Sequence, residues 1–386
     1  MKTIFKTLLL ILITSLAAQS QNKHILSEVL KTSSNSELKL NLNNAFVQLE
    51  QSPDDNIYLD YSMEFKNYEV DEFESIIKGI STNLEQKGSN YILTLDSKHA
   101  MSSVVFSLES SYGISLDNAF ATGEASNRKI KKSKDALIKM MSWDDAKAEV
   151  FLETLKKYKA DGTTEPIDLN EVKSYSVKCI VKVPQRVKLN LQLKQSEVQF
   201  RYDAYNEIRC EGEQTTIRGQ KFINEKSKFQ LNGGMFKVHV LSGGDFMFKD
   251  LNKVMIAEMD NVSIDSEFSD FSIGEVGSSV KITDFNSEFW LYNFDANMGT
   301  FNMDTEYSKI NLYVTFSSDN IAITTFGYGT VHYMNNLKTE IPPSRNKTSS
   351  KMMVIGDDNA STKNKIRLNS INGIIRIGED FIDFSN

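Results

Sequence analysis

The sequence predicts an all-β fold, a β-solenoid of stacked repeats, and three observations support this prediction. First, apolar and polar residues alternate with a period of two over most of the 386 residues, which is typical of strands with one buried face. Second, glycine and asparagine residues that tolerate positive φ separate the apolar stretches. Third, five twelve-residue segments align without a gap and share apolar residues at positions one, three, ten and twelve: Phe229–Val240, Val262–Ile273, Val280–Leu291, Phe301–Leu312 and Ile366–Ile377. Such repeats cannot bury their apolar faces alone and therefore stack.

The spacing of the repeats predicts the geometry of the stack. Segments that begin at residues 262, 280 and 301 are 18 and 21 residues apart, so we expect about 18–21 residues per rung. A similar pattern at 40–60 and 189–211, aligned with a two-residue gap, indicates that the N-terminal region belongs to the same stack. The inward side chains expected to stack are Val262, Val280 and Phe301 in one set and Ile273, Leu291 and Leu312 in the other.

Residues 1–20 have the features of an export signal peptide. Lys2 and Lys6 precede the apolar run Leu8–Leu16, and Ala18–Ser20 has the small-x-small pattern of a cleavage site. The run is shorter than the about 20 residues that a membrane-spanning helix needs, and no later stretch reaches that length. We therefore expect an exported mature chain without a transmembrane segment.

Residues 21–126 are expected to form an N-terminal β region with one short helix. Val70–Ile80 has apolar residues at helical spacing and predicts that helix. Period-two alternation predicts strands over Leu38–Leu42, Phe46–Leu49, Ile57–Asp60, Tyr91–Leu95, Val104–Leu108 and, in the repeat region, Tyr175–Val183.

Residues 127–165 are expected to form a helical insertion near 130–162, and residues 166–386 the solenoid repeats. Ser142 can cap a helix in the insertion and Gly162 can end it. Between them, apolar residues recur at helical spacing.

The charge and the cysteine count exclude several classes of protein. Without the signal peptide, 42 basic residues (44 − 2) face 51 acidic ones, a net charge of about −9. This charge argues against nucleic acid or anionic lipid as a partner. The two cysteines, Cys179 and Cys210, are too few for a disulfide framework or a four-cysteine zinc site. Both are expected to point inward, and the sequence leaves open whether they form a disulfide or remain two buried thiols.

Several segments resemble a known family. Val183–Val187 with the alternating leucines that follow, and repeats such as Ser266–Gly274 and Tyr307–Leu312, are similar to the exported β-strand-repeat proteins of Gram-negative bacteria that are named as adhesins. The resemblance covers about residues 175–385 and, less closely, 36–60. It implies a right-handed β-solenoid exposed in the periplasm or at the cell surface, and it implies no catalytic residues.

Sequence motifs for catalysis or for metal and cofactor binding are not found. The four histidines are scattered, and none has a second histidine at metal-ligand spacing. The sequence has no Gly-x-Ser-x-Gly motif and no phosphate-binding loop. We therefore expect no catalytic residue, no metal site and no cofactor.

One group of aromatic residues predicts ligand contact. Alternation places Trp290, Tyr292 and Phe294 on the face opposite the core, and Tyr313 at the rung position equivalent to Tyr292. Aligned aromatic side chains on an outer face can stack on sugar rings or anchor a partner protein. The alternative is that the helix expected at 143–159 covers them with its apolar stripe.

We therefore expect an exported, non-catalytic protein that presents a binding or adhesion surface, with a glycan or a cell-envelope protein as the class of partner. The alternative is a polysaccharide-active enzyme, a lyase or hydrolase of the parallel β-helix type. Such an enzyme needs paired carboxylates, or a base beside a cation, on adjacent rungs. Asp270, Glu288 and Lys309 form an acid–acid–base column at aligned positions.

Overall fold

The computed structural model describes residues 21–97, 104–110, 114–116, 129–130, 136–142, 155–158, 161, 163–168, 170, 172–313, 319–333, 338–344, 346, 349–355 and 364–378. The expected signal peptide lies outside these residues. Most of the described residues are in β-strands, and one helix, α2 (Val70–Lys78), is present among them. The all-β prediction is confirmed, and so is the short helix expected at Val70–Ile80.

Twelve strands precede the repeat region and include the five predicted from alternation within residues 38–108. They are β1 (Gln21–Lys31), β2 (Glu37–Asn43), β3 (Phe46–Gln51), β4 (Asn56–Lys66), β5 (Ser81–Lys87), β6 (Asn90–Asp96), β7 (Val104–Ser110), β8 (Ile114–Leu116), β9 (Lys129–Ile130), β10 (Ala136–Ser142), β11 (Leu155–Tyr158) and β12 (Thr164–Pro166).

The repeat region begins with the predicted long strand and continues to residue 378. Its strands are β13 (Lys173–Val183), β14 (Lys188–Lys194), β15 (Glu197–Phe200), β16 (Ile208–Ile223), β17 (Lys228–Ser242), β18 (Asp245–Asp260), β19 (Ser263–Glu267), β20 (Asp270–Val276), β21 (Val280–Phe285), β22 (Glu288–Leu291), β23 (Thr300–Glu306), β24 (Lys309–Tyr313), β25 (Asp319–Phe326), β26 (Thr330–Tyr333), β27 (Thr339–Ile341), β28 (Ser350–Ile355), β29 (Asn364–Ile371) and β30 (Ile374–Gly378).

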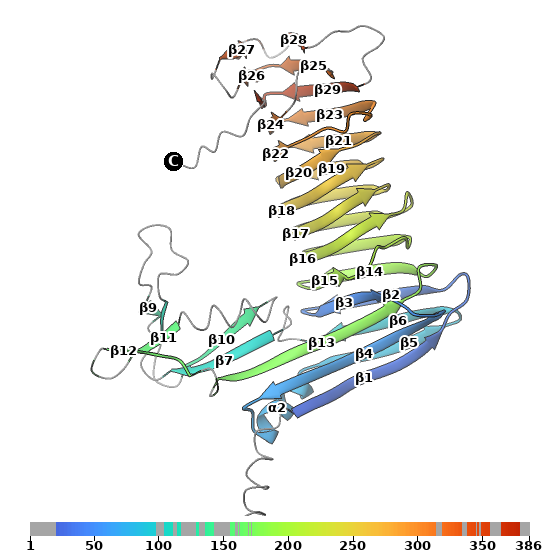
Figure 1. The fold of residues 1–386 in the computed structure, drawn as a ribbon, viewed down its shortest axis with the longest axis vertical. Coiled ribbons are helices and arrows are strands. Elements are labelled where there is room, and N and C mark those ends of the chain that lie inside the picture. The colour runs from blue at the N-terminus through green and yellow to red at the C-terminus, as the bar shows by residue number, and fades with distance from the viewer. Residues whose placement is uncertain are drawn as a thin grey trace, which may run out of the picture.

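Two parallel ladders run through the molecule. Ladder 1 contains, in spatial order, β2, β14, the first halves of β16, β17 and β18, and then β19, β21, β23, β29 and β25. Ladder 2 contains β3, β15, the second halves of β16, β17 and β18, and then β20, β22, β24, β30 and β26. One strand of each ladder with the bend between them is called a rung here, and Figure 1 shows the rungs stacked along the long axis.

The predicted spacing of the rungs is found in the pairing of the strands. Ile264 pairs with Ile282, 18 residues later, and Val280 pairs with Phe301, 21 residues later. In ladder 2, Leu291 pairs with Ile273 on one side, as predicted. It pairs with Leu312 on the other side, also as predicted.

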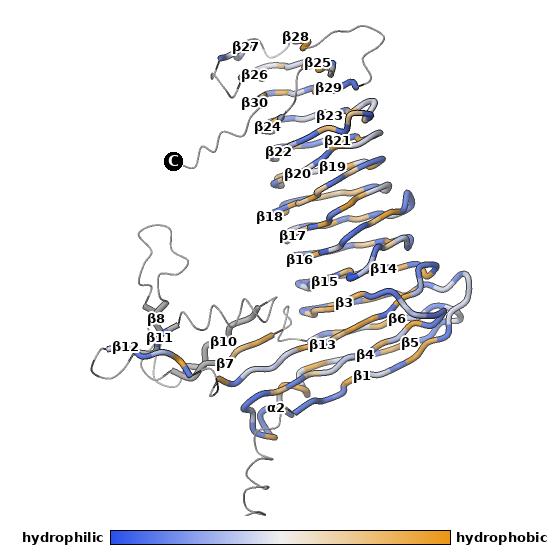
Figure 2. Tube along the Cα trace, viewed as in Figure 1, coloured by the Kyte–Doolittle hydropathy of each residue, from blue (hydrophilic) through white to orange (hydrophobic). Residues whose placement is uncertain are grey.

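A continuous column of buried side chains runs through ladder 1 and forms half of the core. Its members share one inward position of successive rungs, and each is at most 2% exposed. In spatial order they are Leu93, Leu40, Leu191, Cys210, Phe229, Phe246, Ile264, Ile282, Met303, Leu368 and Ile323. Figure 2 shows the alternation of hydrophobic and hydrophilic residues that keeps such columns inside. Because each rung buries its apolar face on its neighbours, stability is shared along the stack.

Hydrogen bonds between neighbouring bends hold the rungs in register. The bend residue lies in the left-handed region, with φ of 50° at Phe268 and 61° at Asn286. The hydroxyl of Ser269, the next residue, donates to the carbonyl oxygen of Glu267 (2.9 Å) and accepts from the backbone N–H of Leu251 in the preceding rung (3.1 Å). A serine at this position therefore closes its own bend and fixes the adjacent one.

The C-terminal repeat does not occupy the end of the stack. β29 and β30 pair with β23 and β24 on one side and with β25 and β26 on the other. Residues 364–378 therefore lie between the rung of 300–313 and the rung of 319–333. The rung that comes last in the sequence is inserted beneath one that comes earlier.

Antiparallel strands close the sheet at both ends of the ladders. Beyond β25 and β26 lie β28 and β27, which pair antiparallel with them. At the other end, β6 pairs in parallel with β2 and β13 pairs in parallel with β3. The antiparallel strands follow these two: β5 pairs with β6, β4 pairs with β13, and β1 pairs with β4. These strands use backbone groups that would otherwise form open edges of the ladders.

The predicted helical insertion is wrong for the described part of residues 127–165, which forms β9, β10, β11 and β12; residues 143–154 lie outside the described residues. β10 pairs residue by residue with β7. β11 pairs with β8 and β12 in a separate four-stranded sheet. Hydrogen bonding and packing across these pairs outweigh the local helical spacing of apolar residues.

The register of two early repeats differs by two residues from the sequence alignments. Phe229 pairs with Phe246, which pairs with Ile264, whereas the alignment placed Phe229 opposite Val262. In the N-terminal rung, Leu38 rather than Leu40 pairs with Leu189. That pairing confirms that β2 and β3 belong to the same stack.

Candidate functional site

Three of the four predicted aromatic residues form a stack on the outer face of ladder 2. Trp290 lies in β22, Tyr292 follows it, and Tyr313 is the last residue of β24. The ring of Tyr313 lies 5.5 Å from that of Tyr292 with an angle of 12° between the planes, and 6.3 Å from that of Trp290 with an angle of 21°. Trp290 and Tyr292 are half-buried, and Tyr313 is buried. We call these three residues the aromatic cluster.

The pairing of the strands explains why the rings meet. Leu291 pairs with Leu312, so the residues that follow them, Tyr292 and Tyr313, lie at equivalent positions of adjacent rungs. A strand spacing of about 4.8 Å brings such rings to stacking distance. Burial, with a smaller contribution from Tyr292, raises the pKa of the Tyr313 hydroxyl.

Phe294, the fourth predicted residue, does not share this surface. Its side chain is 9% exposed, its backbone bridges to Val276, and its ring lies 5.6 Å from the ring of Phe301. The alternation that placed it outward ends where β22 ends, at Leu291, because the chain turns there. Phe294 is therefore a core residue, which corrects its assignment as a ligand contact.

The predicted cover over the aromatic cluster is not found in the described part of residues 143–159. Leu155–Tyr158 forms β11, which belongs to the four-stranded sheet and lies far from β22 and β24 (Figure 1). Residues 143–154 lie outside the described residues.

The carboxylates considered for an enzyme do lie on adjacent rungs. Asp270 pairs with Glu288, and Glu288 pairs with Lys309. The Glu288 carboxylate is already engaged: Lys309 Nζ lies 3.6 Å from Oε2, and Asn311 Nδ2 donates to Oε1 at 3.5 Å. Asp270 and Lys309 are exposed. The predicted alignment of the three residues on adjacent rungs is confirmed. Their contacts are the ion pairs and hydrogen bonds common on the charged face of a sheet.

Glu197 is a buried carboxyl on the outer face of ladder 2, and sequence reasoning missed it. Its side chain is fully buried; Oε1 accepts hydrogen bonds from Gln199 Nε2 (2.6 Å) and Arg218 Nε (3.1 Å). Burial raises the pKa of this carboxyl to about 7, although Gln199 and Arg218 oppose the change. Its neighbours in the column, Phe46 and Thr216, carry no carboxyl group, so no acid pair forms here. In the sequence, the alternation of β15 indicates only that Glu197 points outward, and it gives no sign that this side chain is buried.

A groove of about 400 Å³ crosses ladder 2 beside the aromatic cluster. It begins at Gly219 and Gln220 in β16 and passes over β17, β18 and β20 to Tyr292. Its polar side chains include Lys237 and His239, and no aspartate or glutamate lines it. No sequence motif marks this groove, because it results from small side chains at one outward position on successive rungs.

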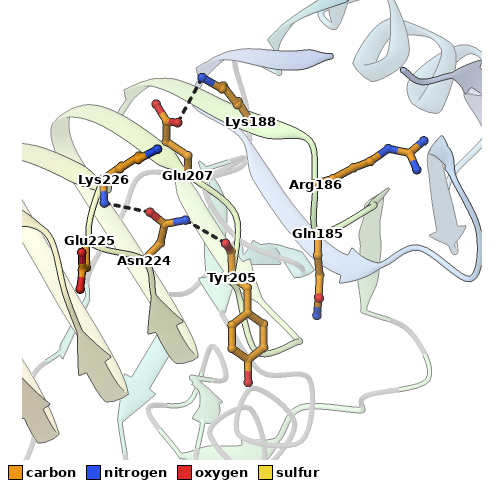
Figure 3. A pocket seen from close by; sticks show the side chains of 8 residues that line it. All are labelled: Gln185, Arg186, Lys188, Tyr205, Glu207, Asn224, Glu225 and Lys226. Atoms are coloured by element: carbon orange, nitrogen blue, oxygen red, sulfur yellow. Dashed lines mark hydrogen bonds and ion pairs between the residues drawn. The ribbon is translucent and has the colours of Figure 1, made fainter. Parts of the chain in front are cut away.

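A second pocket, of about 460 Å³, lies at the turns that connect the rungs near β14 and β16 (Figure 3). Its polar groups are largely engaged with one another. Lys188 Nζ lies 3.1 Å from Glu207 Oε2, and Asn224 Nδ2 donates to the carbonyl oxygen of Tyr205 at 3.0 Å. Figure 3 shows these pairs, with the Tyr205 ring directed away from them. This arrangement indicates a structural turn cluster.

Both cysteines are buried and free. Cys179 lies in β13, which continues ladder 2 beyond β3, whereas Cys210 lies in the first half of β16, which belongs to ladder 1. In ladder 2, β3 and β15 stand between β13 and the second half of β16. The two cysteines are therefore on different ladders and at least three strand spacings apart along the stack, roughly 14 Å, whereas a disulfide needs Cα atoms within about 7 Å. Burial raises the pKa of the Cys179 thiol to about 12 and that of the Cys210 thiol as well. The structure therefore favours two buried thiols over the possible disulfide.

Among the residues that the structure describes, no group of three or more histidine, cysteine, aspartate or glutamate side chains is placed to hold a metal ion. No helix there has the length and apolar character that crossing a membrane requires.

A second exposed aromatic surface, which the sequence analysis missed, follows the bends between the ladders. Phe268, Phe285 and Tyr307 are 45%, 38% and 51% exposed. Their rings meet edge to face, 5.5 Å apart for Phe268 and Phe285 and 5.9 Å for Phe285 and Tyr307. Phe268, Asn286 and Tyr307 occupy the same bend position of three successive rungs, and all three have a left-handed φ. Asparagine tolerates this conformation, whereas an aromatic residue adopts it rarely. An aromatic residue at this position, directly before the serine of the repeat, is therefore the sequence signal that could have predicted this surface.

Comparisons with known proteins give little further information. No family model and no curated protein matches this chain. Among solved structures, a "putative cell adhesion protein" from Clostridium sporogenes ATCC 15579 aligns over 94% of this chain and 100% of that chain, with 9% identity and a TM-score of 0.19. Similarity this low supports no argument about function.

Proposed function

We propose that this chain is an exported, non-catalytic binding protein, a right-handed β-solenoid that contacts its ligand through the aromatic cluster. In this proposal residues 1–20 are the signal peptide, 21–126 an N-terminal β region and 166–386 the solenoid repeats. The protein acts in the periplasm or at the surface of a Gram-negative bacterium. Its ligand is a glycan or a protein of the cell envelope.

The two continuous parallel ladders support the solenoid. Both ladders keep the same strand order over successive rungs, and apolar columns fill the space between them. The inserted C-terminal rung departs from simple sequential stacking, yet it pairs in parallel with both neighbouring rungs.

The stack of three aromatic rings is the observation that carries the binding function. Trp290 and Tyr292 expose part of their surface on the flat outer face of ladder 2, and Tyr313 holds both rings by stacking. Rings fixed in advance lose little side-chain entropy when a ligand binds. Stacked aromatic groups of this kind add about 0.5–1.5 kcal/mol each beyond the area that they bury.

Replacing Trp290 with alanine is expected to weaken ligand binding roughly tenfold, since loss of one stacking contact of about 1.4 kcal/mol corresponds to that factor. The free energy of unfolding should change by no more than about 1.5 kcal/mol, because Trp290 is half-buried. The measurement is binding of the purified mature chain to an array of acidic and neutral glycans, followed by titration of the glycan bound best.

Phe285→Ala is the matched control, because Phe285 is an exposed aromatic residue at the bends rather than on ladder 2. Loss of binding in this variant instead would assign the ligand to the bend surface. Loss of stability without loss of binding in Trp290→Ala would show that the aromatic cluster serves packing alone.

The alternative function is a polysaccharide lyase or hydrolase, and one observation favours it: Asp270 pairs directly with Glu288. The same glycans should therefore be assayed for turnover. Product formation that Asp270→Asn and Glu288→Gln abolish would support the enzyme and contradict the non-catalytic proposal. The ion pair between Glu288 and Lys309 leads us to expect binding without products.

A further inference from the structure

A column of outward side chains runs along the groove beside the aromatic cluster, and two of its positions carry almost no side chain. Gln220, His239, Ala257, Gly274 and Tyr292 occupy one outward position on five successive rungs, because the pairing offset is constant around each of them. The side chains at both ends of this column are large. Those of the two central rungs are a methyl group and a hydrogen atom.

The central rungs cannot simply close up around this gap. A Cβ atom at Gly274 would lie 2.5 Å from the carbonyl oxygen of Ala257, so a side chain there would collide with the backbone of the adjacent rung. The backbones of His239 and Tyr292 remain three strand spacings apart, roughly 14 Å. The ladder therefore keeps an open slot next to the ring of Tyr292, and this slot is the middle of the groove of about 400 Å³.

The groove is lined by a lysine and by no acidic residue, although the protein as a whole is acidic. Lys237 and His239 line it, and Ser272 adds a hydroxyl group. His239 lies 4.0 Å from Glu258, whereas Lys237 forms no ion pair with any residue that the structure describes. Lys237 pairs in the ladder with Arg218 of the preceding rung, and the guanidinium of Arg218 already forms an ion pair with the buried Glu197 (3.1 Å). Lys237 is therefore the cation of the groove that an anionic ligand can pair with.

We propose that the slot over Ala257 and Gly274 binds one acidic sugar residue, a uronic-acid ring. This inference rests on the proposed binding function and assigns its ligand class. The sugar ring stacks on Tyr292 and takes the place of the missing side chains. The carboxylate pairs with Lys237, and His239 and Ser272 donate to the ring hydroxyl groups.

The test is to fill the slot. Ala257→Tyr places a large side chain in the slot, two strand spacings from Tyr292, and occupies the space of the sugar, so binding of acidic glycans should fall at least tenfold. Lys237→Gln keeps the slot open and should abolish the preference for acidic over neutral glycans. Thr283→Tyr adds the same side chain at an exposed position of ladder 1 and should leave binding unchanged. Thermal unfolding of each variant checks that it remains folded.

The probes are a trimer of α-linked galacturonic acid, the neutral trimer of galactose, and the acidic and neutral glycans of the array. If the wild-type chain binds no glycan, the glycan form of the proposed function and this inference both fail. If Trp290→Ala loses binding while Ala257→Tyr keeps it, the aromatic cluster binds the ligand and the slot does not. A preference for neutral glycans would also overturn the inference.

Discussion

Replacing Phe289 with alanine is expected to lower the free energy of unfolding by about 3–5 kcal/mol, the range for deleting a buried aromatic ring. Phe289 is fully buried in ladder 2. Its ring stacks on that of Phe271 at 4.4 Å with 12° between the planes, and on the other side Phe289 pairs with Ile310. The cavity would lie between two rungs whose strands are fixed by hydrogen bonds to their neighbours, so the site can collapse only partly.

Urea unfolding followed by circular dichroism measures this loss. Phe285→Ala, four residues earlier in the same rung, deletes an identical side chain that is 38% exposed and should cost less than about 1 kcal/mol. Equal losses in the two variants would mean that the apolar column through ladder 2 is not the core of the protein.

Replacing Ile375 with aspartate is expected to detach the C-terminal end of the stack and to cost about 4 kcal/mol or more. Ile375 is fully buried and pairs with Ile310 on one side and with Val331 on the other. A carboxylate there has no partner, and it interrupts the rung that joins residues 319–333 to the rest of the ladders.

Limited proteolysis gives the most direct measurement of this effect. We expect the variant to be cleaved within residues 319–355 while β16 to β22 stay protected, because stability in stacked repeats is carried by neighbouring interfaces. Arg367→Asp in the same rung is the control, since Arg367 is exposed. Uniform protection in Ile375→Asp would contradict the observed position of the last rung.

Most of the fold could be predicted because strands with one buried face leave a period of two in the sequence. The strands at Leu38–Leu42 and Tyr175–Val183, and the stacking of Leu291 between Ile273 and Leu312, followed from that period and from the repeat spacing. The same period also limits the prediction. A shift of two residues keeps every side chain on its own face. Alternation therefore could not show whether Phe229 shares its column with Ile264, as it does in the structure, or with Val262.

The order of the last rungs could not be predicted, because each repeat offers nearly the same apolar surface to any other. In the structure Ile366 of β29 pairs with Phe301 of β23, and β25 pairs with the other side of β29. The sequence alone is equally compatible with β25, which comes earlier in the chain, pairing directly with β23. The strands in 127–165 were missed for a related reason. Apolar residues of Leu155–Tyr158 match a helical stripe locally. Pairing with the next strand, β12, and with β8, about 40 residues earlier, makes this segment a strand.

The candidate site was predictable in part. Trp290, Tyr292 and Tyr313 were found because their positions within the repeat place them outward on adjacent rungs. Phe294 was misassigned because the strand ends before it. The slot over Ala257 and Gly274 was missed because it consists of absent side chains, which become visible only when the rungs are aligned in their true register.

The measurement that tests the account most directly is a cross-link between adjacent rungs of ladder 2. Asp270 and Glu288 are paired in parallel strands, so cysteines at both positions should form a disulfide on mild oxidation, seen by mass spectrometry of linked peptides. Cysteines at Ser272 and Glu288, which a two-residue shift would pair, should stay reduced. A bond in the second variant and none in the first would contradict the register on which both the aromatic cluster and the slot depend.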